Sequence, residues 1–221
     1  MFADEHFNTT ELADTLCNRL LEPGIFRASD GLFLSLSGME GGEKTFFLKL
    51  VLVPMLQKRG ALVIYVGLEL VQDATQASSA VLESIARALK ELSSPAKFQE
   101  QTGEAVAPSF SFKPETVGRV DGVTLADAFV EVVGTIDKNI VLIINDVEKL
   151  LKSKSGRRFL FALKAARDAV NLRLNNPKDT YALVVGAGSD PSLISAMTSR
   201  TSQPFFGAEH MALGSMHWRA V

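Results

Sequence analysis

The chain has 221 residues, 47% hydrophobic and 22% charged, with a formal net charge of −2 and a pI of about 6.0. This balance suits one α/β domain with a sizeable core, and the overall charge gives no indication of binding to nucleic acid or to an anionic membrane. The single Cys17 excludes an intramolecular disulfide and a zinc site built from cysteines. We expect a cytoplasmic protein of one domain, residues 1–221, without a signal peptide or a membrane span.

The first 29 residues are predicted to form an N-terminal helical segment. Leu12, Leu16 and Leu20 recur at the spacing of one helix face, which predicts a helix over residues 9–21. A Pro-Gly pair follows and ends this helix.

A phosphate-binding loop is indicated directly after a short apolar strand, Leu32–Leu36. The P-loop pattern is G-x-x-x-x-G-K-[ST], and Gly38, Lys44 and Thr45 fall on it. In an intact site the lysine reaches the β- and γ-phosphates, and the hydroxyl binds Mg²⁺. Glu43 stands where the last glycine belongs, so a carboxylate adds negative charge and bulk beside the expected phosphates.

The residues of this turn that we predict to bind nucleotide are Gly38, Gly41, Gly42, Lys44 and Thr45. A glycine turn that merely joins a strand to a helix is the alternative. A helix over residues 43–57 is predicted next. Pro54 lies inside it, and we expect this proline to kink the helix or to end its regular part.

The middle of the chain alternates between apolar and polar segments. Residues 61–66 form a continuous apolar strand typical of a parallel sheet, and residues 78–92 have helical periodicity. Residues 93–122 are polar and contain three prolines, so we expect an irregular connecting excursion with a short hairpin at residues 110–112. A binding loop is the alternative for this excursion. A helix over residues 124–136 follows, and its first threonine is predicted to cap it.

The strongest strand, residues 139–146, ends in a pattern that is similar to a Walker B motif. In that motif an Asp positions Mg²⁺ and a following Glu polarises the attacking water. Here the first position is Asn145, a neutral side chain and a poor partner for a divalent cation. We predict that Asp146, at the second position, is catalytic and binds magnesium together with Thr45 if nucleotide binds. Glu148 lies beyond these positions, and a polar cap on the strand is the alternative.

A helix over residues 157–174 and a strand over residues 181–185 come next. Ser189 follows this strand, and we predict that it is catalytic as a sensor of the γ-phosphate. A plain Gly-Ser turn is the alternative. A short helix is expected at residues 193–197. Arg200 could offer its charge to nucleotide on a neighbouring subunit, or it could be a solvated surface residue.

The alternation of strands and helices predicts a three-layer α/β sandwich with a mostly parallel sheet. Ligands of such sheets bind at the carboxyl ends of the strands, so we expect Lys44 and Asp146 to face one another there. His6, His210 and His217 lie far apart in the sequence and lack the spacing of a metal site.

The motifs and their order resemble a bacterial family of AAA-type ATPases related to the signal-transducing STAND proteins. The family's loop, roughly G-P-R-R-V-G-K-S-T-F-L, corresponds to residues 38–48, and its L-I-P-A-L stretch to residues 52–56. Its strand G-A-L-x-x-Y-V corresponds to residues 60–66. Two later motifs are more specific: F-A-L-K-A-A-R-D is present at residues 161–168, and Q-P-F-[FY]-G-A at residues 203–208.

The resemblance covers most of residues 30–208 and implies a P-loop NTPase fold with ATP and magnesium as cofactors. Two departures fall on the chemistry, because Glu43 replaces a glycine and Asn145-Asp146 replaces Asp-Glu. The chain also ends at Val221, where AAA proteins continue into a helical lid. We therefore expect a non-hydrolysing, degenerate AAA-type protein that acts on a protein partner as adaptor, regulator or inhibitor. An ATP-binding switch or a slow ATPase is the alternative.

Overall fold

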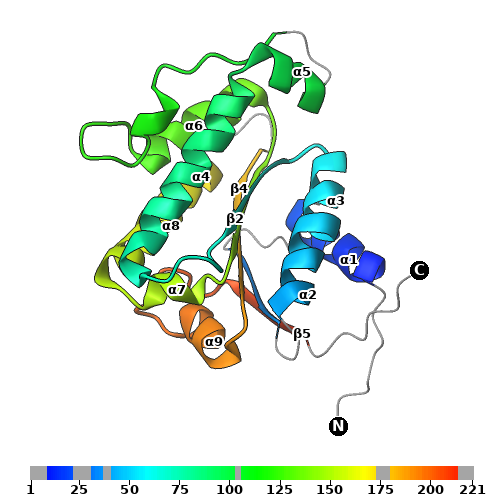
Figure 1. Ribbon diagram of the computed structural model, residues 1–221, viewed down its shortest axis with the longest axis vertical. Helices are drawn as coiled ribbons and strands as arrows, with labels where there is room; N and C mark the ends of the chain where they lie inside the picture. The colour runs from blue at the N-terminus through cyan, green and yellow to red at the C-terminus, as the bar shows by residue number, and fades with distance from the viewer. Residues whose placement is uncertain (1–8, 22–30, 37–40, 103–105, 173–179, 214–221) are drawn as a thin grey trace.

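The computed structural model describes residues 9–21, 31–36, 41–102, 106–172 and 180–213 (Figure 1). Within these residues five strands form one parallel sheet, in the order β2-β3-β4-β1-β5. The strands are β1 (Leu32–Leu36), β2 (Leu62–Gly67), β3 (Ile140–Asn145), β4 (Ala182–Gly188) and β5 (Glu209–Leu213). The α/β class with a parallel sheet, predicted from the alternating pattern, is confirmed.

Helices cover both faces of the sheet (Figure 1). One face is covered by α1 (Thr9–Leu21), α2 (Gly41–Phe46) and α3 (Val53–Lys58). The other face carries α4 (Ala77–Leu92), α5 (Pro95–Thr102), α6 (Leu125–Ile136), α7 (Glu148–Leu151), α8 (Lys154–Asn171) and α9 (Pro191–Ser199). Two short 3₁₀ turns lie at Ala74–Gln76 and Pro114–Thr116. None of the helices in the described residues is long and apolar enough to cross a bilayer.

The central strands are apolar along their whole length because helices cover them on both sides. Every residue of β1, β3 and β4 is buried. Successive side chains of β3 alternate between the two layers: Leu142 and Ile144 pack with α4, α6 and α8, whereas Val141 and Ile143 pack with α1 and the helix after β1. The sheet thus separates two hydrophobic clusters.

The helix after β1 does not end at Pro54, since α3 continues through it to Lys58, and its winding changes in the turn before the proline. A π-helical segment, Phe47–Leu52, joins α2 to α3, and the Val53 N–H bonds to the carbonyl of Leu48, five residues earlier. Pro54 has no N–H to donate, and its ring crowds the preceding turn. The wider π turn accommodates this loss without breaking the helix.

Side-chain caps set where the later helices begin. The Thr124 hydroxyl accepts a hydrogen bond from the backbone N–H of Asp127 (3.1 Å), which confirms the predicted cap of α6. Ser153 likewise accepts from the N–H of Gly156 (2.9 Å), so α8 begins at residue 154 rather than 157. Asp190 caps α9, which therefore also begins earlier than its apolar residues suggest.

Two elements differ from the sequence-based expectation. Strand β5 was not predicted. It is only five residues long and begins with two polar residues, so its sequence lacks a clear strand pattern. The excursion at residues 93–122 contains helix α5, which starts at Pro95 and buries Phe98 in the core. No strand is present at residues 110–112 of the described chain, so the expected hairpin is wrong. The rings of Phe110 and Phe112 stack there instead, 5.3 Å apart.

The parallel register brings the carboxyl ends of neighbouring strands to one edge of the sheet. Gly67 of β2 pairs with Asn145 of β3, and Asn145 pairs with Ala187 of β4. On the other side of β4, Gly188 pairs with Ser35 of β1. Residues that directly follow these strands therefore lie close together.

Candidate functional site

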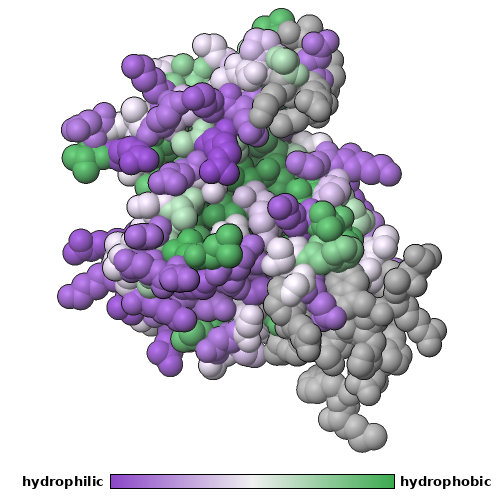
Figure 2. Space-filling model, in the orientation of Figure 1, coloured by the Kyte–Doolittle hydropathy of each residue, from purple (hydrophilic) through white to green (hydrophobic). Residues whose placement is uncertain are grey.

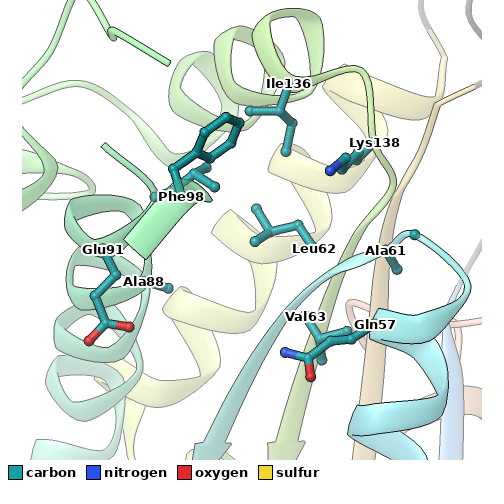
Figure 3. Close-up of a pocket in the computed structure, with 11 residues that line it drawn as sticks. Gln57, Ala61, Leu62, Val63, Ala88, Glu91, Phe98, Ile136 and Lys138 are labelled. Atoms are coloured by element: carbon teal, nitrogen blue, oxygen red, sulfur yellow. The ribbon is translucent and has the colours of Figure 1, made fainter. Parts of the chain in front are cut away.

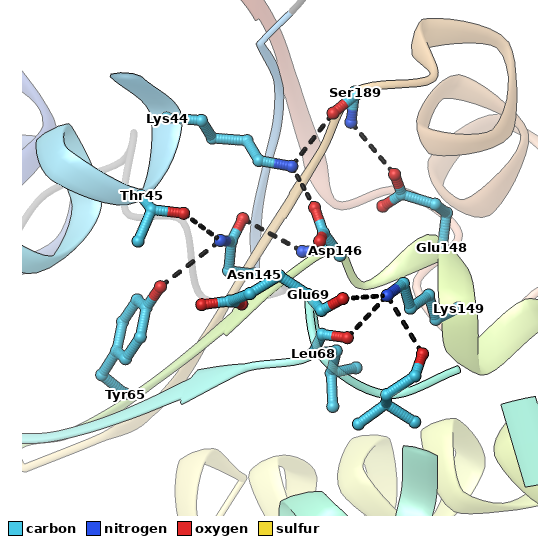
Figure 4. A network of polar contacts seen from close by, with 11 residues as sticks. Lys44, Thr45, Tyr65, Leu68, Glu69, Asn145, Asp146, Glu148, Lys149 and Ser189 are labelled. Carbon is cyan, nitrogen blue, oxygen red and sulfur yellow. Dashed lines mark hydrogen bonds and ion pairs between the residues drawn. The ribbon is translucent and has the colours of Figure 1, made fainter. Parts of the chain in front are cut away.

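Polar side chains meet at the carboxyl ends of β3 and β4 (Figure 4). They are Lys44 and Thr45 from α2, Asn145 and Asp146 at the end of β3, and Ser189 after β4. These five include every predicted site residue except the loop glycines. Ligands of open α/β sheets bind outside the carboxyl ends of the strands, so this cluster is the candidate functional site.

Lys44 is buried, with only 4% of its surface exposed. Its ammonium forms an ion pair with Asp146 and donates a hydrogen bond to the Ser189 hydroxyl (3.0 Å). A buried ammonium is costly unless it is paired and hydrogen-bonded. The Lys44 charge is therefore stabilised by two of the residues that sequence analysis assigned to catalysis.

Asn145 is completely buried and makes hydrogen bonds with both ends of its amide. Its Nδ2 donates to the Thr45 hydroxyl (3.1 Å) and to the phenol oxygen of Tyr65 (3.3 Å). Its Oδ1 accepts from the backbone N–H of Asp146 (3.1 Å). The amide thus connects β2, β3 and α2, and it directs N–H groups, not a negative charge, toward Thr45.

Asp146 adopts a left-handed backbone conformation, with φ of 58°. Few residues other than glycine adopt this conformation, and Asp and Asn are among those that do most often. The turn ends β3 abruptly, and the carboxylate lies beside the Lys44 ammonium. The aspartate therefore combines a charge for Lys44 with a side chain that tolerates the turn.

Glu148 belongs to the same cluster, although sequence analysis gave it no role. Its Oε1 accepts the backbone N–H of Ser189 (3.1 Å), and its Oε2 is buried with no hydrogen-bond partner among the described residues. The carboxylate packs closely over Gly188, where an added Cβ would lie 2.2 Å from Oε2. The sequence signal was an acidic residue two positions beyond Asp146, and only the fold shows that it reaches β4.

Lys149 fixes the segment that follows β2 (Figure 4). Its ammonium donates to the backbone carbonyls of Leu68 (2.7 Å), Glu69 (2.9 Å) and Val71 (3.1 Å). Nearby, burial of the Tyr65 phenol and then the Glu69 carboxylate raise the pKa of Tyr65 above its ordinary value of 10.0. The three hydrogen bonds of Lys149 thus connect the segment after β2 to α7.

The predicted loop glycines have different places in the structure. Gly38 lies outside the described residues. Gly41 and Gly42 are the first residues of α2, and a Cβ added at Gly42 would meet nothing within 4 Å. Glu43 is half-buried in the first turn of the same helix, one residue before Lys44. The carboxylate at the position of the P-loop glycine is thus part of the helix that carries Lys44.

Other residues weighed from the sequence lie away from this cluster. Arg200 is exposed at the end of α9. His210 contacts the Ser35 hydroxyl (3.0 Å) between β5 and β1. Burial raises the pKa of Cys17 to about 11, as expected for a thiol inside the core. Among the described residues, no group of three or more His, Cys, Asp or Glu side chains is placed to hold a metal ion.

The two most specific family-like motifs contact one another in the core. The guanidinium of Arg167 lies over the ring of Phe205, 5.6 Å from its centre, and Phe205 in turn packs on Phe33 (4.8 Å). Arg167 is 3% exposed and also bonds to Asp168. Burial acts to raise the pKa of Asp168, but hydrogen bonds from Lys164 and Arg167 outweigh it and hold that pKa below its ordinary value. These motifs join α8 to the segment before β5, and they place no group in the candidate site.

Comparison with known proteins supports the fold. No protein-family model and no curated protein matches the sequence. The structure is similar to a Walker-type ATPase of Pyrococcus abyssi (TM-score 0.59, 14% identity), over 94% of this chain and 53% of that one. It is also similar to the ORC2 protein of Aeropyrum pernix, solved in ADPNP–ADP complexes (TM-score 0.57, 18% identity), over 96% of this chain and 50% of that one.

The chain has the fold of a P-loop ATPase. It spans about half the length of these two proteins. Both are archaeal, so the bacterial family suggested by the motifs stays a prediction.

The groups at the candidate site fit a phosphate better than they fit Mg²⁺. The Lys44 ammonium and the Ser189 hydroxyl can both donate to phosphate oxygens. Magnesium prefers carboxylate and water oxygens in a regular octahedron. Asn145 offers no negative charge, and the Asp146 carboxylate is paired with Lys44. A metal ion at Thr45 would have to compete with Lys44 for that carboxylate.

Proposed function

We propose that this protein is a non-hydrolysing member of the P-loop ATPase fold, of the AAA type, which acts through contacts with another protein as an adaptor, regulator or inhibitor. The observation that carries the proposal is the neutral, fully buried Asn145, which donates a hydrogen bond to Thr45. In P-loop ATPases this hydroxyl and an aspartate hold the magnesium that neutralises the phosphates. With an amide in that position, the charge that organises hydrolysis is missing.

The state of Lys44 and Glu43 supports the same proposal. The Lys44 ammonium is paired with Asp146, and this negative charge beside it weakens its attraction for a phosphate. Glu43 places a carboxylate one residue before it. Two like charges about 4 Å apart repel by roughly 4 kcal/mol at an effective dielectric constant near 20, so a carboxylate in this turn opposes a bound polyphosphate.

An ATP-binding switch, or a slow ATPase, is the second candidate. It is favoured by the convergence of Lys44, Thr45, Asp146 and Ser189 at one edge of the sheet. The Aeropyrum pernix protein was solved with ADPNP and ADP, and this chain shares its fold at 18% identity. In this second function Asp146 would exchange Lys44 for magnesium when nucleotide arrives.

Calorimetry with Mg-ATP tests the proposal on the wild-type chain and on the double variant Glu43→Gly with Asn145→Asp. We expect no measurable binding or turnover by wild type, and binding by the double variant, because it regains a glycine in the turn and an anionic ligand for the metal. Wild-type turnover of about one per second or more, abolished by Lys44→Ala, would overturn the proposal, since kinases and related enzymes work in this range. Lack of binding by a folded double variant would mean that Glu43 and Asn145 are not the reason why wild type fails to bind Mg-ATP.

We also propose that the partner is a protein rather than a nucleic acid, and that the pair works in the cytoplasm. A net charge of −2 supports the first part, because affinity for nucleic acid depends on clustered positive charge.

A further inference from the structure

Strand β2 is an edge strand of the sheet that the described residues form. Within the described chain β2 pairs only with β3, as the first strand in the sheet order. The N–H of Leu62 donates to the carbonyl of Asn139 (2.8 Å), and the N–H of Leu68 to that of Asn145 (3.2 Å). Because the direction of backbone groups alternates along a strand, the even-numbered residues face β3. The N–H and C=O groups of Val63, Tyr65 and Gly67 therefore point outward.

This edge lacks the features that usually prevent strand pairing. Proteins protect such edges with charged side chains, prolines or bulges. The sequence of β2, Leu-Val-Ile-Tyr-Val-Gly, contains none of them. The opposite edge is different: β5 begins with Glu209, which is ion-paired with Arg19. One edge strand is thus charged, and the other is uncharged and half-exposed.

A pocket opens beside the amino end of β2 (Figure 3). Its volume is about 290 Å³, and its apolar lining includes Leu62, Leu92, Phe98 and Ile136. Polar side chains line it as well, namely Gln57, Glu91 and Lys138. Pockets for small-molecule ligands span roughly 300–1,000 Å³, so this one is at the lower limit and suits one or two apolar side chains.

Apolar surface is also present on the face of the molecule that is turned toward the viewer in Figures 1 and 2, where β2 lies. Figure 2 shows an apolar hollow there, bounded by hydrophilic side chains. Leu70, just after β2, is 89% exposed. Exposed apolar residues beside an unpaired strand are typical of interaction sites.

We propose that this edge binds an extended segment of a partner protein by strand addition, with one apolar side chain of that segment in the pocket. The outward N–H and C=O groups of Val63 and Tyr65 recognise the partner's backbone, which a helix cannot offer. The pocket selects an apolar anchor residue. The inference rests on the proposed function, because it names the surface through which the protein contacts act.

A display library of random nine-residue peptides, selected on the full chain, tests the proposal. We expect the enriched peptides to share an apolar position within an extended pattern. Val63→Pro should weaken their binding about tenfold or more, because it removes an outward N–H and leaves the ladder with β3 intact. Val63→Thr is the matched control and should bind like wild type. Ala88→Phe, which fills the pocket from α4, should weaken binding to a similar degree.

The peptides themselves supply a second arm that does not depend on how the variants fold. N-methylation of alternate amides should abolish binding in one register and leave it unchanged in the other, because only every second N–H of an added strand faces β2. No enrichment, equal binding of both methylated peptides, or equal binding to wild type and a folded Val63→Pro would overturn the proposal. So would a concentration-dependent dimer lost in Val63→Pro, which would assign the edge to a second copy of the chain. Peptide binding together with ATP turnover would instead refute only the non-hydrolysing function.

Discussion

The carboxyl and amino ends of the sheet differ in the groups that they bury and expose. At the carboxyl end, Lys44 and Asn145 are buried, Asp146 is largely buried, and their polar groups are paired within this cluster. At the amino end, a pocket opens beside Leu62, on a strand that pairs on one side only within the described residues. Buried polar groups are costly to disturb, because removing one partner leaves the other unsatisfied. We therefore expect stability to depend on the carboxyl end and partner binding on the amino end.

The largest effect is expected for Asp146→Ala. It leaves the Lys44 ammonium, whose side chain is 5% exposed, without its counter-charge. Removing one partner of a buried ion pair costs about 3–5 kcal/mol of unfolding free energy, and alanine also fits the left-handed turn poorly. Urea unfolding at pH 7 measures this loss.

Two controls separate charge from backbone conformation in that experiment. Asp146→Asn keeps a side chain that tolerates the turn, so it should lose less stability than the alanine variant. Adding Lys44→Met to Asp146→Asn removes the unpaired charge and should restore part of the loss. At the amino end, Gln57→Ala alters an exposed side chain and should change stability by about 0.5 kcal/mol or less. A similar loss in Gln57→Ala and Asp146→Ala would break the comparison.

A smaller effect is expected for Glu148→Ala. Its Oε1 accepts the N–H of Ser189, and because Ser189 is an exposed residue, water can partly replace this acceptor, so the expected loss is about 0.5–1.5 kcal/mol. Glu148→Gln keeps an oxygen acceptor and should lose less. Amide exchange of Ser189, followed by NMR, gives a local measurement: exchange should accelerate in the alanine variant and change little in the glutamine variant. Unchanged exchange in both would show that Glu148 does not hold this turn.

Sequence patterns identified the parts of this molecule that depend on local periodicity. The buried strand β3 and the cap of α6 at Thr124 follow from apolar runs and from hydrogen-bonding side chains beside a helix start. Strand β5 was missed because pairing with β1, rather than its own residues, makes Glu209–Leu213 a strand. Helix α5 was missed because its stability comes from Phe98 reaching the core.

The candidate site shows the same division between local pattern and tertiary contact. The P-loop and Walker B patterns placed Lys44 and Asp146 at the same edge of the sheet, since both follow strands of one parallel sheet. Neither pattern predicts the hydrogen bond between Glu148 and the turn after β4, or the hydrogen bond from Asn145 to Tyr65 on β2. Contacts between residues tens of positions apart depend on strand order and register, which one sequence does not specify.

The smallest effect expected at the carboxyl end concerns the pH dependence of stability through Tyr65. Burial, and then the Glu69 carboxylate, raise its pKa above 10.0 in the folded chain. The unfolded chain releases the phenol proton first, so the stabilisation is complete below the unfolded pKa and is lost as pH rises through the folded pKa. Tyr65→Phe should lose less stability above pH 10 than wild type. The chain has two tyrosines, so ultraviolet titration of wild type and Tyr65→Phe isolates this phenol. Glu69→Gln should move the pKa of Tyr65 toward its ordinary value. A wild-type pKa of Tyr65 at or below 10.0 would contradict the buried environment described for this phenol.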